Sequence, residues 1–174
     1  MSEMSEMSEM SDMKVSALTG DSNWFEDFTP GQQMRHARGA TVGDVEGTFV
    51  AKQVMNTAQA HWNEHALLPG SPLGTGRVVF GLITASLVFG LASQDTAENA
   101  LAELGCDALR FTSPVHQGDT LYAYTEVLSA DAAPDNDDAG VVRFKHWGVT
   151  HDDRVVFEGE RTVLVKRRSQ WADR

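Results

Sequence analysis

The sequence predicts an α+β fold in which an antiparallel β-sheet wraps around one buried helix. Residues 78–92 form one apolar segment, VVFGLITASLVFGLA, that is hydrophobic on every side. In a globular chain such a segment indicates a helix enclosed by other structure. Four segments rich in β-branched and aromatic residues follow, and the short polar stretches between them favour antiparallel neighbours.

The chain ahead of this helix predicts an entry strand and a short helix. The Pro-Gly pair at 30–31 separates the aromatic segment WFEDF from an extended stretch that runs to Val42. Thr41 and Asp44 then have the spacing of a capping box, with Asp in place of the usual Glu, and predict a helix to about Met55. One face of this helix would be apolar, formed by Val42, Val45, Phe49 and Val50.

The rest of the folded chain predicts an irregular loop and four strands. Residues 56–68 and the Gly/Pro-rich PGSPLGTG that follows have no regular periodicity. The predicted strands are 108–115, 120–129, 141–150 and 155–166. We therefore expect one domain over residues 21–170.

The N-terminal segment and the single cysteine suggest a cytoplasmic protein. Residues 1–13 repeat a polar triplet and lack the cationic and apolar regions of a secretory signal, so residues 1–20 are expected to be a disordered tail. Cys106 is the only cysteine, which excludes an internal disulfide and a cysteine-based zinc site. The apolar segment 78–92 is shorter than the roughly 20 residues that a membrane-spanning helix needs, so no membrane association is expected.

The charge balance argues against nucleic acid as a partner. The formal net charge is -11, with four lysines and ten arginines against 25 acidic residues. Phosphate binding needs clustered basic side chains. An acidic surface with little lysine is also typical of proteins that work at high salt, and a halophilic source is a hypothesis beside the alternative of an ordinary acidic enzyme.

Three segments carry a resemblance to a known family: WFEDFTPGQQMRHARGATV, SPVHQGDTLYAYTEVL and VVFEGERTVLVKRR. Their order and spacing resemble the MaoC-like dehydratase family over residues 24–168. The segment SQDTAENALAELGCDALRF resembles the mesaconyl-CoA hydratase branch of that family. The resemblance implies a hotdog fold and a hydratase acting on enoyl-CoA thioesters, with hydration of mesaconyl-CoA to β-methylmalyl-CoA as the expected reaction.

The resemblance also places the catalytic pair. The family motif is an Asp and a His five residues apart, ahead of the central helix. Asn56 and His61 keep that spacing, with Asn in the Asp position, as in the mesaconyl-CoA branch. A register that used His65 would put Ala60 at the Asp position, so His61 is preferred.

Hydration requires a base for water, a proton for Cα and donors for the charge on the thioester oxygen. An imidazole exchanges protons near neutral pH, which suits His61 to acid/base chemistry. The amide of Asn56 does not titrate, so an orienting role is expected, and Glu64 is the nearest carboxylate that could be a second base. The resemblance implies that the N–H of Gly81 faces the thioester carbonyl as an oxyanion hole. The alternative is a glycine needed only for packing.

A carboxylated acyl group such as mesaconyl requires a paired cation when it is buried. Arg77, before the central helix, and Arg110, after the family-like segment, are the two candidates, and for each the alternative is an exposed or structural charge. No Gly-rich phosphate loop for CoA is visible.

Other functions are also compatible with the sequence. The alternatives are an (R)-specific enoyl-CoA hydratase for crotonyl-type substrates, a hotdog acyl-CoA thioesterase and a non-catalytic acyl-CoA-binding module. The HWNEH pattern at 61–65 lacks a third ligand and the usual zinc-helix spacing, so neither a metal nor another cofactor is expected. The remaining histidines are interpreted as structural or solvated: His36, His116, His146 and His151. The resemblance implies at least a homodimer.

Overall fold

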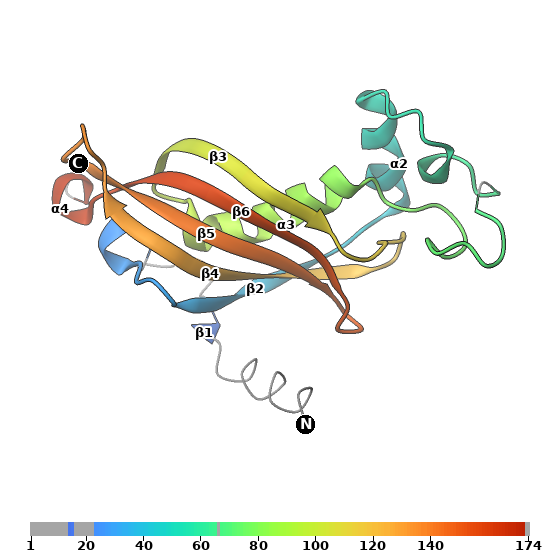
Figure 1. Cartoon of the computed structure of the whole chain (residues 1–174), viewed down its shortest axis with the longest axis horizontal. Helices are drawn as coiled ribbons and strands as arrows, with labels where there is room; N and C mark the ends of the chain where they lie inside the picture. Colours follow the sequence, from blue (N-terminus) through green and yellow to red (C-terminus); the bar gives the residue numbers. More distant parts are fainter. Residues whose placement is uncertain (1–13, 16–22, 66, 173–174) are drawn as a thin grey trace.

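The structure is a computed structural model that describes residues 14–15, 23–65 and 67–172. Its strands are β1 Lys14–Val15, β2 Gln33–Thr41, β3 Ala100–Phe111, β4 Thr120–Ala132, β5 Ala139–Thr150 and β6 Val155–Lys166. Its helices are η1 Phe25–Asp27, α2 Asp44–Gln53, η2 Gln59–His61, α3 Gly81–Thr96 and α4 Arg168–Trp171. Figure 1 shows α3 running along one face of the sheet, with α2 and the loop after it extending beyond one end. The α+β architecture is as predicted.

The six-stranded sheet has the order β1-β2-β4-β5-β6-β3. The pairs β2–β4, β4–β5, β5–β6 and β3–β6 are antiparallel, and β1 pairs with β2 in parallel. The expectation that successive strands are neighbours is therefore wrong for β3 and β4. The eight residues 112–119 lead from β3, at one edge of the sheet beside β6, past β6 and β5 to the interior strand β4.

The strand β3 also begins at Ala100, eight residues before its predicted start. Its first eight residues, ALAELGCD, include several that are depleted in strands, so local propensity does not reveal this part of the strand. Pairing with β6 holds this segment extended, from Ala100 opposite Val165 to Phe111 opposite Phe157. Tertiary pairing overrides the local preference here.

The helix α3 packs against the sheet but is not enclosed on every side. Its inner face carries Val88 and Ala92, each with no exposed surface, and these pack with strand side chains such as Leu121 and Phe157. Its outer face is open, since Leu82 is 49% exposed and Ser86 and Gly90 are exposed. The expectation of a fully enclosed helix is therefore wrong for the single chain.

The cap of α2 differs from the predicted one. The N–H of Gly43 donates to the Glu46 carboxylate at 2.9 Å, which gives a capping interaction two residues later than the predicted Thr41–Asp44 pair. The Thr41 hydroxyl instead lies 2.8 Å from the hydroxyl of Thr120 on β4. The predicted apolar face is only partly buried, because Val45 is 74% exposed.

A chain of polar side chains crosses the core. Nδ1 of His36 lies 2.6 Å from the Asp95 carboxylate, and Nε2 of His36 lies 2.6 Å from the Thr125 hydroxyl. The same hydroxyl lies 2.7 Å from Nδ1 of His146. These contacts join β2, α3, β4 and β5, and all four side chains are buried.

The expected disordered tail falls mostly outside the described residues, which exclude 1–13 and 16–22. Within it, Lys14 and Val15 form β1 opposite Met34 and Arg35, so at these two residues the structure differs from the expectation. Among the described helices, none has the length and apolar character to cross a membrane. The described residues also contain no group of three or more His, Cys, Asp or Glu side chains arranged to hold a metal.

Candidate active site

A cavity of about 420 Å³ lies beside the first turn of α3. Its walls come from the end of η2, the loop before α3, the end of β3 with residues 112–115, and Val156 of β6. His61 and Gly81 both line it. No Lys, Arg, Asp or Glu is among the described residues that form its walls. The cavity is therefore apolar, with a few neutral polar groups.

The ring of His61 is held by the backbone. Its Nδ1 atom lies 2.7 Å from the carbonyl oxygen of Val78, while the N–H of Val78 donates to the carbonyl of Ala60 at 2.9 Å. A carbonyl can only accept, so Nδ1 carries a proton and donates it. In the neutral ring Nε2 then has the free lone pair. The half-buried His61 can accept a proton at Nε2 and return it.

Gly81 supplies a backbone donor to the same cavity. It is the first residue of α3, and no described residue accepts a hydrogen bond from its N–H. First-turn N–H groups have no intrahelical partner, and the helix dipole places partial positive charge there. A Cβ atom at Gly81 would lie 3.0 Å from two ring atoms of Phe111, so the residue also packs tightly. This arrangement suits a developing oxyanion.

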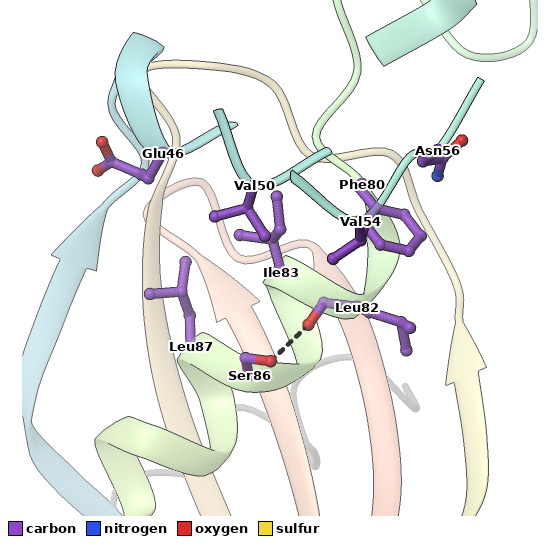
Figure 2. A pocket seen from close by; sticks show the side chains of 9 residues that line it. All are labelled: Glu46, Val50, Val54, Asn56, Phe80, Leu82, Ile83, Ser86 and Leu87. Carbon is purple, nitrogen blue, oxygen red and sulfur yellow. Dashed lines mark hydrogen bonds between the residues drawn. The ribbon is translucent and has the colours of Figure 1, made fainter. Parts of the chain in front are cut away.

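The structure places Asn56 beside a second hollow, the α2–α3 groove. This groove of about 710 Å³ is lined by Glu46, Val50, Val54, Asn56, Phe80, Leu82, Ile83, Ser86 and Leu87 (Figure 2). Phe80 connects the groove with the cavity, because its ring centroid lies 5.6 Å from that of His61. Asn56 and His61 therefore lie near each other but line different hollows.

The side chain of Asn56 makes a hydrogen bond to the loop that carries His61. Its side-chain oxygen accepts the N–H of Ala58 at 3.0 Å, and the carbonyl of Ala58 accepts the N–H of His61 at 3.1 Å. These two bonds shape the turn of η2. Asn56 thus contacts the backbone from which His61 projects.

Glu64 and Arg77 pair with each other. Nε of Arg77 donates to the Glu64 carboxylate at 2.7 Å, and the other guanidinium nitrogens donate to the side chains of Thr48 and Gln117, each at 2.9 Å. The guanidinium therefore bonds to α2 and to the loop before β4, and these bonds hold it in place there. Neither Glu64 nor Arg77 lines the cavity that contains His61.

Arg110 lies apart from the cavity. It lines a hollow of about 160 Å³ with Lys145, Glu158 and Glu160 of neighbouring strands. The next residue, Phe111, lines the His61 cavity. Arg110 is close to the site in sequence. Side chains alternate along β3, so Arg110 points away from the cavity that its neighbour Phe111 lines.

Three hydroxyl residues of the cavity are not identified from the sequence, Thr84, Thr112 and Ser113. The hydroxyl of Thr112 donates to the carbonyl of Val155. Thr84 follows Gly81 by three residues on α3, so both face the same side of the helix. The spacing of Gly81 and Thr84 could have identified Thr84, but the apolar residues around it favour the interpretation of the whole segment as core. Ser113 lies in the crossing loop after β3, whose course could not be read locally.

Comparison with known proteins decides the family. A family model described as mesaconyl-CoA hydratase matches residues 3–167. The chain belongs to the mesaconyl-CoA hydratase family. The resemblance expected from the sequence is thereby confirmed.

Two curated members of the mesaconyl-CoA hydratase family show the extent of the match. The chain is 29% identical to a β-methylmalyl-CoA dehydratase of Chloroflexus aurantiacus, covering 87% of this chain and 47% of that protein. It is 30% identical to a mesaconyl-CoA hydratase of Haloarcula marismortui, covering 86% and 44%. The chain therefore spans about half the length of these curated relatives.

Solved structures agree with this family and confirm the hotdog fold. A MaoC domain dehydratase from Chloroflexus aurantiacus superposes with a TM-score of 0.76 at 28% identity, covering 86% of this chain and 46% of that one. A Mycobacterium tuberculosis protein described as a double hotdog fold superposes with a TM-score of 0.64 at 23% identity, covering 85% and 45%. The second likeness concerns the fold alone.

Proposed function

We propose that this chain catalyses the reversible addition of water to an enoyl-CoA thioester, with mesaconyl-CoA hydrated to β-methylmalyl-CoA. The observation that carries the proposal is that one apolar cavity holds both His61 and Gly81. Among the described residues, none bonds to Nε2 of His61 or to the N–H of Gly81. The names of the curated relatives support the same reaction. An apolar cavity strengthens the hydrogen bond between the N–H of Gly81 and a developing oxyanion because water screens it less.

In the proposed reaction, Nε2 of His61 takes a proton from water as the water oxygen bonds to Cβ. The C=C π electrons move toward the thioester, and the N–H of Gly81 stabilises the resulting enolate oxygen. A proton then bonds to Cα and the carbonyl re-forms, so that H and OH have added across the double bond. His61 can deliver that proton because it has just accepted one.

Asn56 is assigned a positioning role in this proposal. Its bond to the N–H of Ala58 holds the turn of η2 and thereby the backbone of His61. Glu64 as a second base receives less support, since its carboxylate pairs with Arg77. For the same reason, recognition of a substrate carboxylate by Arg77 or Arg110 has no support in the geometry of the single chain.

A second candidate is an (R)-specific enoyl-CoA hydratase for crotonyl-type substrates. One observation favours it, namely that no cationic side chain lines the cavity among the described residues. An uncharged acyl group would need none. The thioesterase alternative has less support, because the described walls of the cavity also lack a carboxylate.

The proposal is tested by adding the protein to mesaconyl-CoA and to crotonyl-CoA while recording enoyl absorbance and free thiol. Hydration removes the conjugated double bond without releasing CoA. A higher kcat/KM for mesaconyl-CoA is expected. A preference for crotonyl-CoA would favour the second candidate, thiol release would indicate a thioesterase, and no reaction with either ester would refute the hydratase proposal.

We also propose that the chain forms a homodimer or larger assembly. The α2–α3 groove and the exposed side chains of Val45 and Phe49 leave an apolar surface uncovered in the single chain. Contiguous apolar surface of this kind usually marks an interaction site. A second copy would cover it and exclude water from Phe80, which lies beside His61.

A further inference from the structure

One hydroxyl of α3 behaves differently from the other three. Ser86, Ser93 and Thr96 donate their hydroxyls to the carbonyls four residues earlier, at 2.7, 2.6 and 2.8 Å. This back-bonding is the usual solution for a hydroxyl within a helix. The hydroxyl of Thr84 makes no hydrogen bond with any described residue.

Thr84 is also buried. Only 2% of its surface is exposed, and it lines the cavity that contains His61 and Gly81. Its Oγ1 is not among the described side-chain atoms that are both closed off from solvent and without a partner, so the hydroxyl is open to the cavity. It can therefore donate a hydrogen bond to an accepting atom of a ligand that fills the cavity.

The position of Thr84 relative to Gly81 sets the distance to such an atom. The two residues are three apart on one helix face, so Thr84 lies about 4.5 Å further along the axis. In a four-carbon dicarboxylic acyl group, the thioester and carboxyl carbons are three bonds apart, a separation close to this rise. Ser113, which also lines the cavity, is half-buried and likewise has no side-chain hydrogen bond with a described residue.

We propose that Thr84 determines specificity by donating its hydroxyl, together with that of Ser113, to the distal carboxylate of the acyl group. This inference rests on the proposed function, in which the N–H of Gly81 holds the thioester oxygen at the other end. Hydroxyl donors replace the cation expected from the sequence, because no Lys or Arg lines the described part of the cavity. A carboxylate accepts strong hydrogen bonds from such donors.

The test uses binding of two saturated thioesters that cannot be hydrated, methylsuccinyl-CoA with a distal carboxylate and butyryl-CoA without one. Titration calorimetry should show that Thr84→Val weakens methylsuccinyl-CoA binding by at least about tenfold, the loss of one hydrogen bond to a charged group. Binding of butyryl-CoA should change less than about twofold, because Val has nearly the shape of Thr. Ser113→Ala should act in the same direction.

Two control variants keep the test specific. Thr84→Ser keeps the hydroxyl and should bind both ligands as the wild type does. Thr96→Val removes a buried hydroxyl of the same helix that bonds to Ala92 and lies outside the cavity, so it should leave the ratio of the two affinities unchanged. Circular dichroism establishes that each variant is folded.

Equal weakening of both ligands by Thr84→Val, no weakening of either, or no measurable binding of methylsuccinyl-CoA to the wild type would overturn the inference. Turnover of mesaconyl-CoA by the wild type is measured separately. Because the binding ligands are unreactive, a protein without hydratase activity can still show the selective loss, and an active hydratase can still lack it. The two failures are therefore distinguishable.

Discussion

Nδ1 of His61 lies 2.7 Å from the carbonyl oxygen of Val78, and the N–H of Val78 donates to the carbonyl of Ala60. This double connection ties the loop carrying the imidazole to the segment that leads into α3. It orients Nε2 without using another ionisable side chain. The proposed base is thus positioned by backbone atoms.

Replacing His61 with Ala should lower kcat by about 10² to 10⁴, the usual contribution of a general acid/base. The fold should persist, since the half-buried ring makes one backbone hydrogen bond. Enoyl absorbance assays at saturating substrate measure the effect. His65→Ala, which removes an exposed side chain nearby, serves as the control, and near-normal turnover by His61→Ala would remove His61 from the mechanism.

Asn56→Asp should retain most of the activity, whereas Asn56→Ala should lose much of it. The reason is that Asp can accept the N–H of Ala58 as Asn does, while Ala cannot. Asn63 makes the equivalent bond to the N–H of His65 at 3.0 Å, so Asn63→Ala is a matched control for loss of such a turn. An inactive but folded Asn56→Asp variant would contradict the positioning role.

Gly81→Ala should reduce kcat/KM by at least about tenfold, the order of a weakened oxyanion donor. The new methyl group would lie 3.0 Å from the ring of Phe111 and force it to shift within the cavity. Gly90→Ala in the same helix is the control, because a Cβ there meets no atom within 4 Å. This control should keep activity and gain about 0.5–1 kcal/mol of stability. Equal activity of both variants would argue against the oxyanion role.

The stability of the fold should fall as the pH drops below about 6.5, where an exposed histidine begins to protonate. Burial first, and then the charge of Arg161 and the neighbouring His36, hold the pKa of His146 well below its ordinary value. The unfolded chain therefore binds a proton that the folded chain excludes, so His146 contributes stability that is present above that pH and lost below it.

Urea unfolding between pH 5 and 7 measures this dependence. The slope attributable to His146 is at most about 1.4 kcal/mol per pH unit. His146→Phe should flatten the pH dependence even if it lowers stability at pH 7. A variant with the wild-type slope would show that another group is responsible.

Light scattering should give a mass at least twice the 19.0 kDa of one chain. With a net charge of -11, added salt should also raise the unfolding temperature, because it screens repulsion within and between chains. Phe49→Glu should weaken the assembly, since this side chain is 56% exposed beside the α2–α3 groove. A monomeric mass at every salt concentration would refute the assembly proposal.

The sequence was sufficient for most of the fold because its strong signals are local. The predicted range of β6 equals the observed one, and the predicted central helix differs from α3 only at its ends. Apolar and β-branched segments can be recognised from the local sequence, without knowing which segments they pack against. The start of β3 and the pairing of β4 with β2 depend on contacts between distant residues, and no local pattern encodes those contacts.

The candidate site divides in the same way. The resemblance to the family implies His61 and Gly81 as site residues, and both line one cavity. Arg77 and Arg110 are close to the site along the chain, which is why the sequence suggests them. In the structure, the guanidinium of Arg77 donates to Thr48 and Gln117. Arg110 lines another hollow, because side chains alternate along β3. Thr84 was missed because its missing hydrogen bond is visible only in three dimensions.

The edge position of β3 determines when the site can form during synthesis. Phe111 pairs with Phe157, and the next residue, Thr112, bonds through its N–H and its hydroxyl to the carbonyls of Val156 and Val155. One wall of the cavity therefore has no support until β6 has left the ribosome. Although His61 and Gly81 are made early, the pocket between them and Phe111 closes only with the last strand. A nascent chain that stops before residue 155 would carry both of these residues without an enclosed place for a substrate.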